Sequence, residues 1–145
     1  MNKLLKNIIT PVVIITGLNL FPSPTPAEVV EGGSVLCYNR NLETKIAVSI
    51  NRFNAAICST RDNREHYYVG QSKNSNEKVF VSAQEIYMNG GKKFKAINGS
   101  YSYQIVATCN PNRRYNDSVT VSVFQKGKKI ANHRTNRYMT SVPWC

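Results

Sequence analysis

Residues 92–109, KKFKAINGSYSYQIVATC, contain two alternating runs that meet at a turn signal. In the first run apolar residues alternate with lysines, and in the second, apolar and aromatic residues recur at every second position from Tyr101 to Cys109. Between the runs, Asn98-Gly99 accepts the positive φ angles that a tight two-residue turn requires. The stretch therefore predicts a β-hairpin that ends in a cysteine.

Further β patterns lie on both sides of this hairpin. Residues 44–50 place Ile46, Val48 and Ile50 on one predicted face and Lys45, Ala47 and Ser49 on the other, which is typical of a strand with one face in water. Residues 118–124 alternate valines with serine and threonine in the same way. Shorter β-rich runs lie at 34–38, 54–59, 66–71 and 129–132, residues 78–88 form one bent strand or two short ones, and residues 133–145 look irregular.

These runs predict the fold class. No window shows a sustained apolar pattern at helical spacing, and turn signals recur about every 8 to 12 residues, as in sandwiches and small barrels. We expect an all-β fold, a small antiparallel sandwich or barrel of about seven or eight strands.

The first 27 residues differ in kind from the rest. A start with two lysines, an apolar middle and a small-residue segment that ends at Ala27 predict a secretory signal peptide at 1–27. We expect cleavage after Ala27, with an uncleaved anchor as the alternative. The remaining residues, 28–145, have the length of a single exported β domain. We expect a secreted or periplasmic location.

The four cysteines, Cys37, Cys58, Cys109 and Cys145, all lie in the predicted exported domain. An even count in an oxidising compartment predicts two disulfides. We favour Cys37 with Cys58 and Cys109 with Cys145, because these pairings close short loops, but the sequence leaves all three connectivities open. No C-x2-C pair is present, so we expect no zinc site, no other metal and no cofactor.

Basic residues are in excess and gather in clusters. Without Lys3 and Lys6 the chain keeps 17 basic and 8 acidic residues, a net charge of +9. Such an excess predicts attraction to an anionic polysaccharide, envelope polymer or membrane surface, whereas solvated turns that protect sheet edges are the alternative interpretation. The candidate anion-binding residues are Lys92, Lys93, Lys95, Arg113, Arg114, Lys126, Lys128 and Lys129.

Catalytic patterns are weak. The two histidines, His66 and His133, suit an acid and a base of a secreted ribonuclease, but no motif places them together. G-x-S-x-G does not occur, and the scattered carboxylates offer no near pair. We therefore expect no catalytic residues and a non-enzyme, with no specific nucleic acid partner and an open oligomeric state.

Tyrosines offer a second kind of surface. We interpret them mainly as cross-strand core pairs, which aromatic residues favour in sheets, with a carbohydrate-binding groove as the alternative. The residues concerned are Tyr67, Tyr68, Tyr87, Tyr101 and Tyr103.

The hairpin region resembles small exported β proteins of photosynthetic bacteria without an assigned function. The resemblance covers about residues 92–130 and implies export and a β fold, but no activity. The residues that carry it are Phe94, Ala96, Asn98, Gly99, Tyr101, Tyr103, Ile105, Val119, Val121, Val123 and Gly127.

A second resemblance is to the membrane-bound and periplasmic inhibitors of C-type lysozyme. These small disulfide-linked barrels have a Ser-Gly-x-x-Tyr element and a later Lys-Gly element that approach the lysozyme active site. Residues 98–101 echo the first element and Lys126-Gly127 echoes the second. The resemblance implies inhibition of lysozyme, although lysozymes are generally cationic and a partner of charge +9 is repelled at long range.

Overall fold

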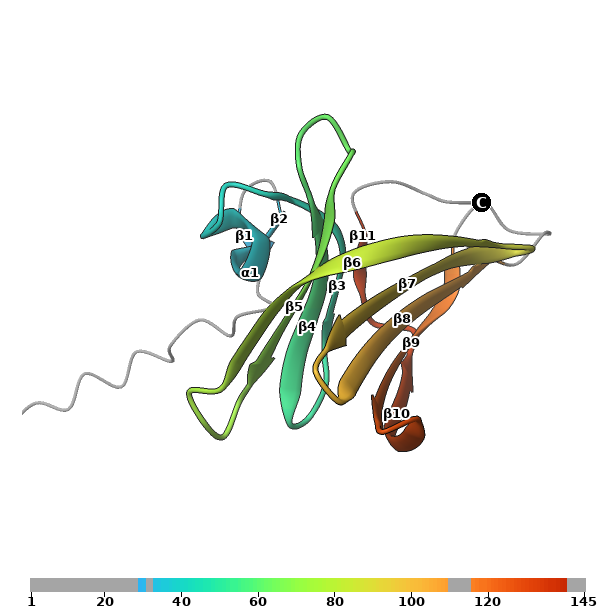
Figure 1. Cartoon of the computed structure of the whole chain (residues 1–145). Helices are drawn as coiled ribbons and strands as arrows, with labels where there is room; N and C mark the ends of the chain where they lie inside the picture. Colours follow the sequence, from blue (N-terminus) through green and yellow to red (C-terminus); the bar gives the residue numbers. More distant parts are fainter. Residues whose placement is uncertain (1–28, 31–32, 110–115, 141–145) are drawn as a thin grey trace, which may run out of the picture.

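One nine-stranded antiparallel sheet dominates the computed structural model, which describes residues 29–30, 33–109 and 116–140 (Figure 1). Its strand order is β10-β9-β8-β7-β6-β5-β4-β3-β11, so each strand from β3 to β10 pairs with the next along the chain. The strands are β3 (Glu43–Ser49), β4 (Phe53–Ser59), β5 (His66–Ser72), β6 (Lys78–Met88), β7 (Gly91–Asn98), β8 (Tyr101–Cys109), β9 (Asn116–Gln125), β10 (Lys128–Thr135) and β11 (Met139–Thr140). The all-β prediction is confirmed. In place of the expected sandwich or barrel of seven or eight strands, nine described strands form a single curled sheet, a half-barrel.

The predicted hairpin forms β7 and β8. Asn98 lies opposite Tyr101, so the two loop residues are Gly99 and Ser100, and of these only Gly99 has a positive φ, of 59°. The expected turn is therefore shifted by one residue. A positive φ confined to the first loop residue is the pattern of a type II′ turn, which favours glycine there.

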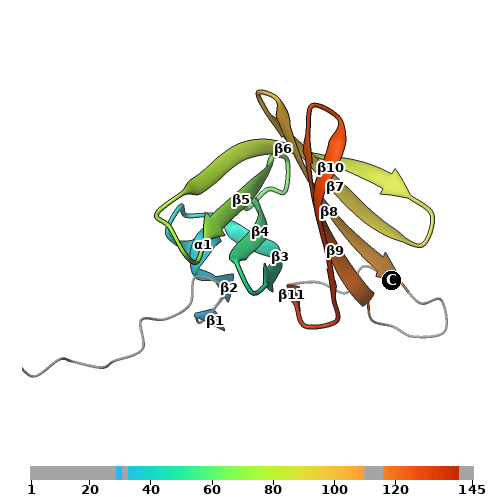
Figure 2. The ribbon, with the colours of Figure 1, turned by 90° about the horizontal axis from the view of Figure 1, so that it is seen from below.

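β6 divides the sheet into two arms. It pairs with β5 over residues 78–83 and with β7 over residues 83–88. The pairing partner of β6 therefore changes at Ala83. Figure 1 shows β6 crossing the width of the molecule, and Figure 2 shows β3–β5 facing β7–β10 across the space between them. We call β3–β5 the first arm and β7–β10 the second arm.

The inner faces of the two arms make the main hydrophobic core. Side chains alternate along each strand, so the predicted buried sets of β3 and β9 meet between the arms. This core consists of Ile46, Val48, Ala55, Ile57, Tyr68, Ala83, Phe94, Ala96, Ile105, Ala107, Val119 and Val121.

A short helix covers the outer face of the first arm. Residues 34–38 do not form the expected strand: Ser34 ends β2 (Gly33–Ser34), which pairs with β1 (Val29–Val30), and α1 (Val35–Tyr38) follows. The Ser34 hydroxyl accepts a hydrogen bond from the Leu36 N–H at 3.3 Å, which caps the helix. The prediction was wrong because five apolar-rich residues have no periodicity that separates a strand from one helical turn.

The contact between α1 and the sheet forms a second core. Leu36 and Cys37 pack on outward-facing residues that include Ala47, which is 2% exposed. The expectation that Ala47 faces water is therefore wrong. The predicted Cys37–Cys58 disulfide is confirmed and joins α1 to β4. Cys145, one half of the predicted Cys109–Cys145 bridge, and the predicted signal peptide lie outside the described residues.

The chain after β10 crosses to the opposite edge of the sheet. Residues 136–138 lead directly into β11, whose Met139 pairs with Ala47 of β3. The interpretation of residues 133–145 as irregular is thus wrong for β10 and β11. Tyr138 packs against the main core, so this crossing brings the two edges of the curled sheet together. Among the residues described, no helix has the length and apolar character needed to span a membrane.

Candidate anion-binding face

The structure separates the eight predicted anion-binding residues into groups. Lys92, Lys93 and Lys95 lie on β7. Lys126, Lys128 and Lys129 lie at or next to the turn between β9 and β10, where Lys126 has a φ of 48°. Arg113 and Arg114 lie outside the described residues.

Strand alternation divides the three lysines of β7 between the two faces of the sheet. Lys92 shares the inner face with Phe94 and Ala96, which are both buried in the core. Its Nζ donates a hydrogen bond to Glu85 Oε1 at 2.6 Å, and both side chains are about one-third exposed. Lys92 is thus engaged at the end of the inner face, while Lys93 and Lys95 lie on the outer face.

The outer face of the second arm brings further cations beside these two lysines. The register places Lys93 in one cross-strand row with Val106, Thr120 and Arg134. Phe124 of β9 lies opposite Lys129, in a parallel row. Paired residues of neighbouring strands point to the same face and lie about 5 Å apart, so these cations share a surface about 15 Å across. We call Lys93, Lys95, Lys129 and Arg134 the outer basic face.

Two of these cations are held by neighbours on the same face. Arg134 Nε donates a hydrogen bond to the Ser118 hydroxyl at 2.9 Å. Lys129 Nζ lies 5.6 Å from the centre of the Phe124 ring, within cation–π range. Both contacts fix the position of a cation without neutralising its charge, which leaves that charge available to an anion.

The outer basic face contains no carboxylate among its described residues. Its remaining positions on β8 and β9 are serine, threonine, glutamine, valine and phenylalanine. α1 covers only the first arm, so this surface of the second arm is not covered by any described helix. Charge of one sign on an open sheet face is suited to an extended anionic partner.

A cavity of about 670 Å³ adjoins the face where β5 and β7 leave β6. Lys95 and Arg64 bring positive charge to its lining, and His66 and Glu85 also contribute. Arg64 is already paired with Asp62, at 3.3 Å between Nε and Oδ2. The cavity therefore extends the outer basic face with a recess of mixed charge.

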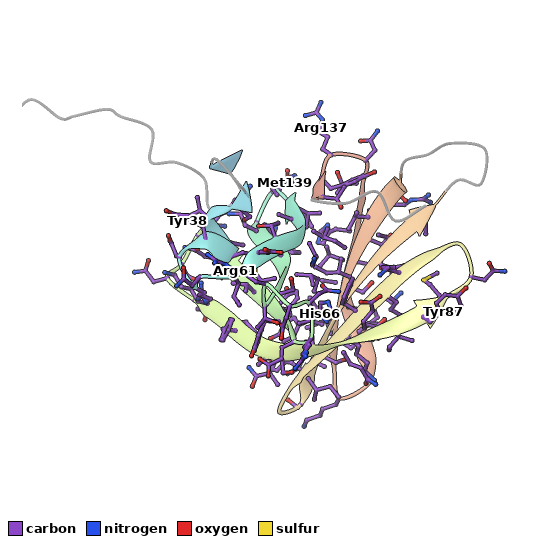
Figure 3. All side chains as sticks on the ribbon, turned by 90° about the horizontal axis from the view of Figure 1, so that it is seen from above. Tyr38, Arg61, His66, Tyr87, Arg137 and Met139 are labelled. Atoms are coloured by element: carbon purple, nitrogen blue, oxygen red, sulfur yellow. A yellow bond between two sulfur atoms is a disulfide. The ribbon has the colours of Figure 1, made fainter. Side chains whose placement is uncertain are left out.

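His66 marks the boundary between this cavity and the core, near the middle of the molecule in Figure 3. Its side chain is only 10% exposed, with Nε2 3.6 Å from Glu85 Oε2 and the ring 5.3 Å from the Phe94 ring. Burial lowers the pKa of His66 below its ordinary value of 6.5, and the positive charges of Lys45 and Lys92 act in the same direction against the opposing effect of Glu85. The folded chain therefore favours neutral His66.

This shift predicts a loss of stability in mild acid. As the pH falls below about 6.5 the unfolded chain takes up a proton on His66 before the folded chain does. The stability that neutral His66 contributes is complete above this pH, and it falls by about 1.4 kcal/mol for each pH unit down to the folded-state pKa. The free energy of unfolding, measured in urea, should decline from pH 7.5 to pH 5.5. The variant His66→Gln should show a smaller decline, and His133→Gln should show the same decline as the unmodified chain. If the free energy of unfolding had the same dependence on pH in all three proteins, the assignment of the decline to His66 would be wrong.

The histidines and tyrosines do not converge on one site. His133 packs its ring edgewise on Phe53, with centroids 5.5 Å apart, and no contact between the two histidines occurs within the described part of the chain. Tyr67 stacks on Phe80 at 4.9 Å, whereas Tyr87, at the end of β6, is 91% exposed and points away from the body (Figure 3). Among the tyrosines that the structure describes, Tyr68 and Tyr103 are the pair whose rings stack on each other.

The described residues contain no group of three or more histidine, cysteine, aspartate or glutamate side chains arranged to hold a metal ion. No family model, curated protein or solved structure significantly matches the chain. A functional proposal for this chain therefore depends on the geometry of its own surfaces.

Proposed function

We propose that the chain is a non-catalytic exported domain that binds an anionic polymer of the cell envelope or its surroundings through the outer basic face. The observation that supports this proposal is the gathering of Lys93, Lys95, Lys129 and Arg134 on one sheet face without a described carboxylate among them. A polymer with regularly spaced carboxylate or sulfate groups can contact several of these cations at once. The open, uncovered surface admits such a chain without a closed pocket.

The nature of these contacts determines how the binding should respond to salt. Exposed charges are screened over about 8 to 10 Å at ordinary ionic strength, so affinity should fall as salt rises. Each lysine near an anionic surface contributes about 1 kcal/mol. The triple variant Lys93→Gln, Lys95→Gln and Lys129→Gln should therefore bind dextran sulfate or alginate roughly 10- to 100-fold more weakly at low salt.

A matched triple variant separates the effect of the outer basic face on binding from the effect of net charge. Arg61→Gln, Lys73→Gln and Lys78→Gln remove the same total charge at exposed positions in the β4–β5 and β5–β6 turns and at the start of β6, away from the second arm. This control should bind within about threefold of the unmodified chain, because only long-range attraction is reduced. Affinities measured by biolayer interferometry from 20 to 500 mM NaCl give the comparison. Equal losses in the two triple variants, or salt-independent affinity, would rule out the outer basic face as the binding surface.

One contact favours a second candidate function, inhibition of lysozyme. The Lys126 N–H donates a hydrogen bond to the Ser100 carbonyl at 2.8 Å, so the turn at residues 98–101 lies beside Lys126-Gly127. These are the two segments that echo the inhibitor elements. Reduced lysis of bacterial cell walls by lysozyme in the presence of the purified chain would support this function. The positive charge of the chain opposes it and favours the polymer.

A further inference from the structure

A second cavity, of about 290 Å³, lies at the other end of the inner face. Phe53 of β4, Tyr68 of β5, Val79 of β6 and Tyr103 of β8 supply its aromatic and apolar walls. Polar groups are present as well, from Arg52, Gln71 and Glu77. We call this cavity the tyrosine cleft; it is formed by both arms of the sheet that face each other in Figure 2.

The tyrosine pair joins the two arms at the cleft. The rings of Tyr68 and Tyr103 stack with centroids 4.6 Å apart and planes inclined by 16°. Gly70 makes this possible, because a Cβ at that position would lie 3.0 Å from both Cε1 and Oη of Tyr68. The Tyr68 hydroxyl therefore lies directly over Gly70, which also lines the cleft.

Both phenol hydroxyls lack a hydrogen-bond partner among the residues that the structure describes. Tyr68 as a whole is only 3% exposed, but the fully buried, unpaired side-chain atoms of the described residues belong to Asn54 and Ser59, so the Tyr68 hydroxyl is accessible from the cleft. Burial raises the pKa of both phenols, so each stays protonated and able to donate as well as accept. Two such groups at one cleft are suited to a ligand that supplies hydroxyl groups of its own.

The rest of the lining fits the same class of ligand. Arg52 only donates, Glu77 only accepts, and the Gln71 amide does both. Sugar hydroxyls donate and accept in the same way, and the apolar C–H face of a sugar ring packs on aromatic side chains such as Phe53. A cavity of about 290 Å³ is near the lower limit for small-molecule sites and accommodates one ring rather than an extended chain.

We propose that the tyrosine cleft binds a single pyranose unit, either as a free hexose or as the terminal unit of a polysaccharide. The proposal does not depend on the outer basic face, because Tyr68 and Tyr103 point to the inner surface of the sheet and Lys93 and Lys95 to the outer one. Binding at the cleft rests on hydrogen bonds and ring packing. It is therefore insensitive to salt, in contrast to the binding of an anionic polymer.

Titration with neutral sugars tests the cleft directly. The probes are glucose, galactose, mannose and N-acetylglucosamine to 100 mM, and maltotetraose and cellotetraose for terminal units, each followed by amide chemical shifts. At least one probe should shift Gly70, Val79 and Tyr103 in a saturable way, equally at 50 and 500 mM NaCl, while Lys93 and Lys95 stay unchanged. Tetrasaccharide binding tighter than that of its monosaccharide would identify a terminal unit, and equal affinity a free hexose.

Conservative variants keep the test independent of folding. Tyr68→Phe and Tyr103→Phe remove one hydroxyl each and keep the stacked rings, so each should weaken binding about 2- to 10-fold. Tyr87→Phe removes an exposed hydroxyl elsewhere and should leave affinity unchanged. The proposal is overturned if no probe shifts the cleft amides, or if both cleft variants bind as tightly as the unmodified chain. Polymer binding by the outer basic face would be unaffected by either result.

Discussion

Replacing Phe94 by alanine is expected to lower the free energy of unfolding by about 3 to 5 kcal/mol. Phe94 is 2% exposed, belongs to β7 of the second arm, and packs its ring 5.3 Å from that of His66 on the first arm. Ile105 lies directly opposite it on β8. The substitution therefore removes a large side chain between the arms and leaves a cavity that these neighbours fill only in part.

Urea unfolding followed by circular dichroism at pH 7.5 measures this loss. A domain of this size has a total stability of about 5 to 15 kcal/mol, so Phe94→Ala removes between about a fifth and all of it. Ile105→Val supplies a graded variant, because it removes one methyl group from the same core and should cost about 0.5 to 1.5 kcal/mol. Ile97→Ala, on the same strand but 63% exposed, should change stability by less than about 0.5 kcal/mol. Comparable losses for Ile97 and Phe94 would contradict the placement of the core between the arms.

Strand alternation in the sequence was enough to predict the hairpin and most of this core. Period two in residues 44–50 and 118–124 assigns each side chain to a face, and the structure confirms which faces meet. Alternation does not show what covers the other face. Ala47 was expected in water for this reason, yet α1 covers it, and the helix itself has too few residues to produce a pattern.

The division of the sheet into two arms was not predictable from periodicity. β6 keeps the same alternation through Ala83, while the change of partner from β5 to β7 at that residue depends on the curl of the whole sheet. Both cavities result from this curl. Their linings combine residues from several strands, which the order of residues along the chain does not bring together.

The candidate face was predictable in part. Lys93 and Lys95 alternate with Phe94, so the sequence already assigns them to the outer face and Lys92 to the inner one. The sequence does not indicate Arg134, because residues 133–145 look irregular. A register shift between Lys129 and Ala131 breaks the alternation of β10, and it hides the period-two signal that would have placed Arg134 on the face.

Removing the Cys37–Cys58 disulfide is expected to lower the free energy of unfolding by about 3 kcal/mol. The bridge closes a loop with a sequence separation of 21 residues, and cross-linking restricts the unfolded chain more than the folded one. It also holds α1 over outward-facing residues of the first arm, including Ala47 and Val69. Loss of the bridge thus weakens the attachment of the helix as well as the constraint on the unfolded chain.

The double variant Cys37→Ser and Cys58→Ser tests this expectation in urea unfolding without reductant, so that any other disulfide stays intact. Amide hydrogen exchange locates the effect. If the bridge acts on global stability, protection should fall by similar free energies at Ala47 beneath α1 and at Ile105 in the main core. Loss of protection at Ala47 alone, with unchanged global stability, would contradict the expected 3 kcal/mol and show that the bridge only attaches the helix. The variant should bind anionic polymer as tightly as the unmodified chain wherever it is folded, because the outer basic face belongs to the second arm.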